Sequence, residues 1–144
     1  MASDDSEVEI RRIDNFEAIE AAKDLFDKPL QPEAIKKFSR EPGHHLLLAY
    51  KNGQPIGMVS GVEMTHPDKG TEMMLYELGV SEEARGHGIG TSLTKAMADL
   101  AKDRGCYGMW TLTDTDNAAG QATYSKTGGK QHPPEIQYSW SFKE

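Results

Sequence analysis

The stretch YELGVSEEARGHGIGTSL, residues 76–93, joins a short apolar strand, an acidic turn and three glycines spaced two apart. A turn of this kind before a helix exposes backbone N–H groups and the positive end of the helix dipole, which together attract an anion. A nucleoside-triphosphate loop is excluded, because Gly90 is followed by Thr91 and Ser92 instead of by a lysine. A dinucleotide fingerprint is disfavoured by the two-residue step from Gly88 to Gly90. The stretch therefore predicts a site for an anion such as a pyrophosphate.

Periodic patterns on either side of this stretch predict a mixed α/β fold. Alternating or continuous apolar runs indicate strands at 8–13, two within 44–64, and others at 72–80, 107–113 and 136–142. The two strands within 44–64 are joined by a tight turn at Asn52-Gly53. Helical spacing and stop signals indicate helices from a cap at Asp14 or Asn15 to before Pro29, and at 32–39, 91–105 and 117–129.

Length and composition favour a single domain. The 144 residues, 37% of them hydrophobic, predict a flexible N-terminus at 1–7 and one domain at 8–144. No apolar run is long enough to span a membrane and the N-terminus is acidic, so we expect a cytoplasmic protein. Cys106 is the only cysteine, which excludes an intrachain disulfide, and no histidine or cysteine spacing indicates a metal site.

The net charge of −7 bears on the partners of the protein. An excess of 23 acidic over 16 basic side chains disfavours nucleic acid and anionic membranes and favours cationic partners. Solubility alone is the other interpretation of this charge.

Two motifs give a family resemblance. Residues 85–90, RGHGIG, resemble the acyl-CoA pyrophosphate loop of the GCN5-related N-acetyltransferases (GNAT), written Arg/Gln-x-x-Gly-x-Gly/Ala. Asn117, Gly120, Tyr124 and Gly128 fall on the family spacing Asn-x-x-Ala-x-x-x-Tyr-x-x-x-Gly. The resemblance covers nearly the whole chain. It implies the GNAT acyl-CoA N-acyltransferase fold, a mixed central sheet of six to seven strands with about four helices.

The sequence departs from this pattern at two glycines. Gly120 replaces the usual small alanine, and Gly129 stands where an aromatic residue commonly follows the last glycine. Neither change removes a reacting group, although glycine inside a helix costs about 1 kcal/mol.

The resemblance implies acetyl-CoA as cofactor and coenzyme A as product. It assigns the pantetheine arm to the backbone of Leu78 to Val80, and the protonation of the departing thiolate to Tyr124. Asn117 either holds the cofactor or caps the short helix. The implied cofactor-binding residues are Leu78, Gly79, Val80, Arg85, Gly86, His87, Gly88, Ile89, Gly90, Thr91, Asn117 and Tyr124.

The acceptor amine must lose a proton before it attacks the thioester. If its pKa is about 9 to 10, being neutral at pH 7 costs roughly 3 to 4 kcal/mol. Glu77 is the candidate catalytic base, directly or through a water, because it lies on the strand that leads to the glycine loop. A structural hydrogen bond to nearby backbone is the other interpretation of this residue.

Within the family, the sequence looks most like the class I aminoglycoside 3-N-acetyltransferases, which confer antibiotic resistance. The resemblance lies in DLFD at 24–27, in LYELGV before RGHGIG, and in Asp116-Asn117 ahead of Tyr124. It implies a polycationic amine acceptor, whose ammonium groups acidic side chains would attract. The expected acceptor residues are Asp24, Asp27, Glu33, Glu77, Asp114 and Asp116, although Asp114 and Asp116 are also typical turn residues.

Other functions stay open. The same acids suit a polyamine or a peptide or protein amine, and binding of acetyl-CoA without catalysis is a further alternative. Relatives in the family commonly pair through their C-terminal strands, so the alternating segment IQYSWSF at 136–142 allows a homodimer.

Overall fold

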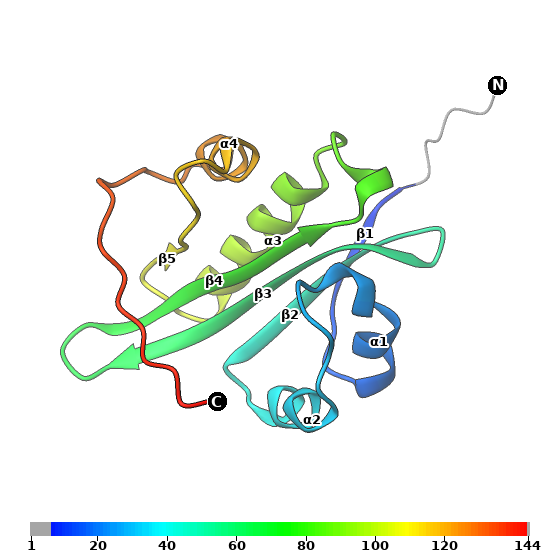
Figure 1. The fold of residues 1–144 in the computed structure, drawn as a ribbon, viewed down its shortest axis with the longest axis horizontal. Helices are drawn as coiled ribbons and strands as arrows, with labels where there is room; N and C mark the ends of the chain where they lie inside the picture. The colour runs from blue at the N-terminus through cyan, green and yellow to red at the C-terminus, as the bar shows by residue number, and fades with distance from the viewer. Residues whose placement is uncertain (1–6, 144) are drawn as a thin grey trace.

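A five-stranded mixed sheet forms the centre of the structure, a computed structural model that describes residues 7–143 (Figure 1). The first four strands are antiparallel neighbours and the fifth runs parallel to the fourth. The sheet order is β1-β2-β3-β4-β5. The strands are β1 Glu9–Arg12, β2 His44–Lys51, β3 Gln54–His66, β4 Gly70–Val80 and β5 Met109–Trp110. Of the N-terminal stretch predicted to be flexible, residues 1–6 lie outside the described residues.

Of the four α-helices in the described chain, α1 and α2 cover one face of this sheet and α3 covers the other (Figure 1), while α4 packs beside α3. The Asn15 cap is confirmed, because its Oδ1 accepts a hydrogen bond from Ala18 N at 2.8 Å. Two short 3-10 turns, η1 and η2, join helices to strands. The bounds are α1 Phe16–Ala21, η1 Lys23–Leu25, α2 Pro32–Arg40, η2 Glu82–Ala84, α3 Ile89–Asp103 and α4 Ala118–Lys126.

Each face of the sheet has its own apolar core. The α3 stripe of Leu93, Met97 and Ala101 packs on β-strand residues that include Val59 and Met73. On the opposite face, α1 and α2 pack on residues of β2 and β3. The long crossover α3 thus carries the chain from the end of β4 to the start of β5.

The predicted hairpin between β2 and β3 is confirmed. Asn52 and Gly53 both have positive φ, 51° and 76°, and Lys51 pairs directly with Gln54. Positive φ at both central residues is what a two-residue turn of this hand requires.

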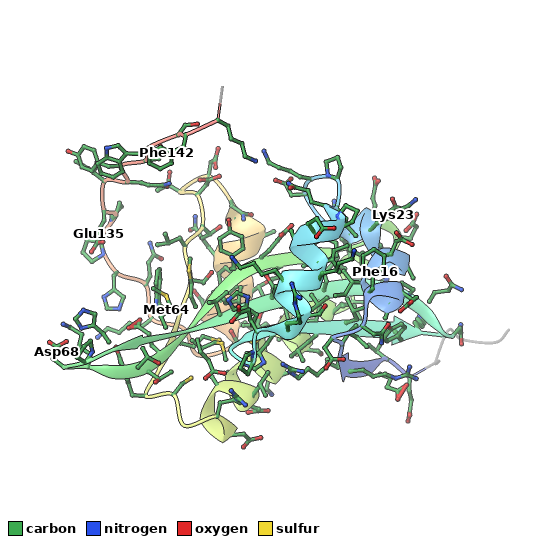
Figure 2. The ribbon with its side chains drawn as sticks, turned by 90° about the horizontal axis from the view of Figure 1, so that it is seen from below. Phe16, Lys23, Met64, Asp68, Glu135 and Phe142 are labelled. Carbon is green, nitrogen blue, oxygen red and sulfur yellow. The ribbon has the colours of Figure 1, made fainter. Side chains whose placement is uncertain are left out.

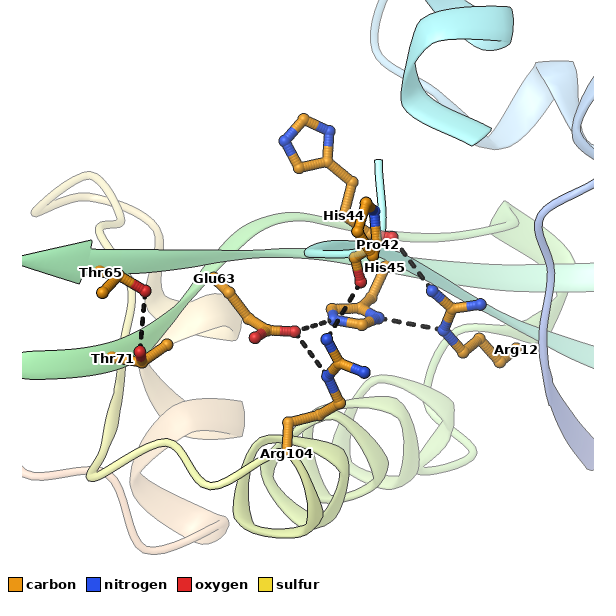
Figure 3. A network of polar contacts seen from close by, with 8 residues as sticks. All are labelled: Arg12, Pro42, His44, His45, Glu63, Thr65, Thr71 and Arg104. Atoms are coloured by element: carbon orange, nitrogen blue, oxygen red, sulfur yellow. Dashed lines mark hydrogen bonds and ion pairs between the residues drawn. The ribbon is translucent and has the colours of Figure 1, made fainter. Parts of the chain in front are cut away.

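A polar network joins β1, β2, β3 and the end of α3 (Figure 3). His45, which is 1% exposed, lies 2.6 Å through Nε2 from Glu63 Oε2 and accepts from Arg12 Nε through Nδ1 at 3.0 Å. Arg104 Nε donates to the same Glu63 oxygen at 2.7 Å. Because Nδ1 is an acceptor, the histidine is the neutral tautomer with its proton on Nε2.

The prediction of six to seven strands is wrong, because the described residues form five. The segment 136–142 was expected to be a strand, but it forms no strand and its four large apolar side chains are 76% to 93% exposed. Figure 2 shows the C-terminal segment with Glu135 and Phe142 standing away from the sheet. Its alternating pattern favours a strand only where a partner strand exists, and no strand in the described part of the chain pairs with it.

Two other elements are shorter than predicted. The strand expected at 107–113 is limited to Met109–Trp110, and the helix expected to run to Pro29 ends at Ala21. After each of these elements, the following residues contact β4: Leu25 lies against Gly79, and the Thr111 side chain bonds Leu75 O.

Within residues 7–143, no helix combines the length and the apolar character that a membrane crossing requires.

Candidate active site

A long groove opens where β5 separates from β4. The two strands pair only at Met73 with Met109 and at Met74 with Trp110, so no strand in the described chain pairs with the rest of β4 on this side. Thr111 continues the contact through its side chain, which donates to Leu75 O at 2.8 Å. The groove is lined by residues 24–28, 30, 75–82, 85, 94, 98, 109–115, 117, 121, 124, 125 and 127–137.

The glycine loop lies at the beginning of α3. Gly86 and Gly88 have φ of 82° and 79°, and a Cβ at either residue would meet nothing within 4 Å. Gly88 is the N-cap of α3, and within the described residues no side chain caps this helix. The loop therefore leaves the first N–H groups of α3 open to an anion, which fits the pyrophosphate of acetyl-CoA.

The remaining loop residues take different positions. Arg85 lines the groove, and its Nε donates to Val80 O at 3.1 Å. His87 and Ile89 line a smaller pocket on the other side, beside Lys51. A Cβ on Gly90 would make ordinary van der Waals contact, 3.7 Å from a Leu78 methyl. Thr91 follows, partly buried, in the first turn of α3.

Tyr124 lies on α4 and lines the groove. Burial raises the pKa of its phenol, while a hydrogen bond with the Thr111 side chain lowers it, and the net effect is an increase. The phenol therefore keeps its proton at neutral pH and can act as an acid.

Asn117 caps α4 in this structure. Its Oδ1 accepts from Gly120 N at 3.0 Å and its Nδ2 donates to Thr113 Oγ1 at 2.8 Å. A Cβ at Gly120 would lie 2.6 Å from Asn117 Nδ2. The glycine that departs from the family pattern thus makes room for the cap.

The second departure also has a structural reason. Gly128 has φ of 96° and its N donates to Ser125 O at 3.1 Å, while Gly129 N donates to Tyr124 O at 2.8 Å. These two bonds form a Schellman motif, which ends α4. A Cβ at Gly129 would lie 2.8 Å from Tyr124 O, so a larger residue would open this end of the helix.

Glu77 lies on β4, with its carboxylate directed to the connection between α1 and α2. Its Oε2 accepts from Asp27 N at 2.9 Å. Glu77 therefore makes the structural hydrogen bond to backbone that was the other interpretation of this residue, and it also lines the groove. One carboxylate oxygen receives the backbone bond, so the other can face an amine or a water.

Contacts with β4 also explain the early end of the first helix. Leu25 O would lie only 2.5 Å from a Cβ at Gly79, so this glycine allows η1 to approach the strand. The approach brings Asp24 and Asp27 to the groove, where Asp114 lies on the far wall. Three predicted acceptor acids thus join Glu77.

The other two predicted acids are not brought to the groove. Glu33 lies on α2, and its Oε1 accepts from Lys36 Nζ at 3.3 Å. Asp116 lies in the turn before α4, where its carbonyl accepts from Ala118 N at 3.1 Å. Neither is among the lining residues.

Sequence reasoning missed the aromatic part of the groove. Tyr76, Trp110 and Leu112 line it and are among the exposed large apolar side chains. Tyr76 is the extra residue of a β-bulge, because Leu75 pairs with Gly61 and Glu77 with Ser60. The bulge is defined by the pairing of β4 with β3 and was not identified from the sequence, so the exposure of Tyr76 was not predicted.

Comparison with known proteins agrees with the geometry of the loop and the groove. Residues 8–129 match the model of the acetyltransferase (GNAT) family. The chain belongs to the GNAT family. The family is one of acetyltransferases, and the described residues form the GNAT α/β fold with five strands and four helices.

Relatives in the family act on different acceptors. N-alpha-acetyltransferase 30 of Schizosaccharomyces pombe is 32% identical over 108 residues, which are 74% of this chain and 70% of that protein. A mycothiol acetyltransferase of Arthrobacter sp. is 30% identical over 89 residues, 58% of this chain. The matched part spans only 28% of the length of that mycothiol acetyltransferase.

Solved structures with the same fold include aminoglycoside acetyltransferases. Enzyme meta-AAC0020 from an uncultured soil metagenomic sample, in complex with sisomicin, has a TM-score of 0.85 at 14% identity, covering 94% of this chain and 97% of that one. AAC(6')-Iy in complex with CoA has a TM-score of 0.80 at 19% identity, covering 94% of this chain and 95% of that one. The comparisons thus support the GNAT prediction without pointing to the 3-N class I enzymes.

Proposed function

We propose that this GNAT enzyme transfers acetyl to an amine of a small polycationic molecule, most specifically an aminoglycoside antibiotic. The observation that carries the proposal is the groove, in which a protonated tyrosine, several carboxylates and Arg85 of the glycine loop line the space beside the free part of β4.

The donor side rests on the glycine loop and β4. The backbone of Gly86 to Thr91 would hold the pyrophosphate, with Arg85 beside it. The backbone of Leu78 to Val80, which pairs with β3 on one side and with no strand of the described chain on the other, would hold the pantetheine arm. Acetyl-CoA, when bound, supplies an activated acetyl thioester.

Two side chains supply the proton chemistry. Tyr124 keeps its phenolic proton at neutral pH, so we assign it the protonation of the thiolate. Glu77 presents a carboxylate to the groove while Asp27 N fixes its orientation, so we assign it the removal of the proton from the amine. Asn117 acts on the cofactor only through the position of α4.

Charge favours a cation on the acceptor side. Six acids line the groove against three lysines and arginines. The resemblance favours the 3-N amine of the aminoglycoside, whereas AAC(6')-Iy is a 6'-N-acetyltransferase by its name. The assay described below therefore has to distinguish acetylation at the 3-N position from acetylation at the 6'-N position.

A peptide N-terminus is the second candidate acceptor. It is favoured by the similarity to N-alpha-acetyltransferase 30, a relative in which the match covers most of both chains. A polyamine would use the same carboxylates.

Thiol release from acetyl-CoA tests these proposals. The purified chain is assayed with aminoglycosides, polyamines and peptides, and the products with aminoglycosides are located by NMR. We expect turnover with aminoglycosides, whose KM rises with salt more than the KM of acetyl-CoA does, because salt screens charge pairs. Turnover on peptides alone would replace the aminoglycoside by the second candidate, and binding of acetyl-CoA without any turnover would mean a non-catalytic binder.

The same proposal includes a homodimer. Residues 136–142 present alternating apolar side chains that no strand in the described chain covers. A second copy could cover them, and sedimentation velocity of the wild-type chain would show the dimer.

A further inference from the structure

We propose that the rings of Tyr76 and Trp110 bind the ammonium form of the acceptor beside Glu77 and so select among amine acceptors. The proposal rests on the acceptor role assigned to the groove above. It adds two side chains that neither the acidic pattern nor the family motifs indicate.

Tyr76 is placed by the bulge in β4. It is the extra residue between Leu75, which is buried under α3, and Glu77, which lines the groove. Tyr76 is 69% exposed and lies on the part of β4 beyond its two pairs with β5. A tyrosine held open next to a carboxylate offers a ring face and a negative charge to the same ligand.

Trp110 extends this surface to the neighbouring strand. It pairs with Met74, two residues before Tyr76, and it is 36% exposed and lines the groove. Adjacent strands are about 4.8 Å apart and two residues span about 6.6 Å, so both rings lie within reach of one small ligand.

An organic ammonium is the occupant that fits both the rings and the charge. The faces of Trp and Tyr rings carry negative potential and attract cations, Trp most strongly. The groove adds Asp24 and Asp27 from the α1–α2 connection to Glu77 on β4. An uncharged apolar ligand would leave these carboxylates without a partner, whereas an ammonium satisfies them and the rings together.

Substitution at Tyr76 tests the proposal in turnover. We expect Tyr76→Phe to keep the acceptor KM close to wild type, because the ring face remains. Tyr76→Leu should raise it about 5- to 30-fold, equivalent to about 1–2 kcal/mol, with the KM of acetyl-CoA unchanged. Tyr107→Leu is the matched control, because Tyr107 is an exposed tyrosine outside the groove. A wild-type acceptor KM in Tyr76→Leu would overturn the proposal.

A binding experiment separates recognition from acetylation. The chain has two tryptophans, so Trp140→Phe leaves Trp110 as the only one. Its fluorescence is titrated with choline, which no acetyl group can reach at nitrogen, and with the neutral isostere 3,3-dimethylbutan-1-ol at constant ionic strength. We expect choline to change the emission at lower concentration than the isostere, and Tyr76→Leu to remove this preference.

The two experiments fail in different ways. If no amine is acetylated, the proposed function is wrong and the choline titration alone decides the inference. Equal responses to choline and to its isostere would mean that the rings select no cation, even in an active enzyme.

Discussion

Tyr124 shows how the environment of a single residue prepares it for chemistry. Burial raises the pKa of the phenol, so it holds its proton at any pH at which the enzyme would work. The spacing from Asn117 to Tyr124 predicted this position from the sequence. The same spacing could not predict the Thr111 side chain, which joins Tyr124 to the exit of β5.

We expect Tyr124→Phe to lower kcat about 10²- to 10⁴-fold, the usual contribution of a positioned acid, with the KM of acetyl-CoA nearly unchanged. Steady-state kinetics measure this. Tyr107→Phe is the control, since that hydroxyl bonds Glu72 outside the groove. A full rate in Tyr124→Phe would show that the thiolate leaves without a proton from this residue.

At the scale of elements, turn residues and apolar periodicity correctly predicted the elements whose geometry depends on neighbouring residues. The Asn52-Gly53 hairpin and the α3 helix ending near Gly105 formed as expected. The first helix and β5 are shorter than predicted, and the segments that follow them contact β4, which lies far away in the sequence. Short-range patterns carry no information on such contacts.

The turn into α3 gives the prediction at this scale. Gly88 has φ of 79°, which an alanine adopts at a cost of about 1–2 kcal/mol. We expect Gly88→Ala to lower the free energy of unfolding by about that amount. Gly108→Ala is the control, because Gly108 is outside the positive-φ region and faces open space. Urea denaturation measures both.

Gly88→Asn then separates backbone strain from ligand approach. Asparagine tolerates left-handed φ, so stability should largely return, whereas its side chain enters the space left for the pyrophosphate. Calorimetry should therefore show weakened binding of CoA in a stable variant. Wild-type affinity would mean that no ligand comes close to this glycine.

At the scale of the whole molecule, the network around His45 ties three adjacent strands, β1, β2 and β3, to the end of α3. Burial lowers the pKa of His45, although the hydrogen bond to Glu63 acts in the opposite direction. In the unfolded chain the same histidine takes a proton near its ordinary pKa of about 6.5. The stability contributed by the neutral form is thus present above pH 6.5 and is lost as pH falls through the lower folded-state pKa.

We expect the free energy of unfolding to fall between pH 6.5 and 5 by up to about 1.4 kcal/mol per pH unit from this one group. His45→Gln should flatten that slope, because an amide can donate to Glu63 and accept from Arg12 without titrating. His132→Gln, at an exposed position, should leave it unchanged. An unaltered slope in His45→Gln would exclude the network as its source.

The single extra residue at Tyr76 also reverses the parity of β4. Before the bulge Met73 and Leu75 face α3, and after it Leu78 and Val80 do so. Odd-numbered side chains therefore face α3 before the bulge and the opposite face of the sheet after it, which is why Glu77 meets Asp27 instead of the core under α3. If Tyr76 took part in regular alternation, without a bulge, Glu77 would face α3 and Leu78 would face the opposite side. The one extra residue thus allows the same strand to pack its apolar side chains under α3 and to present Glu77 to the groove.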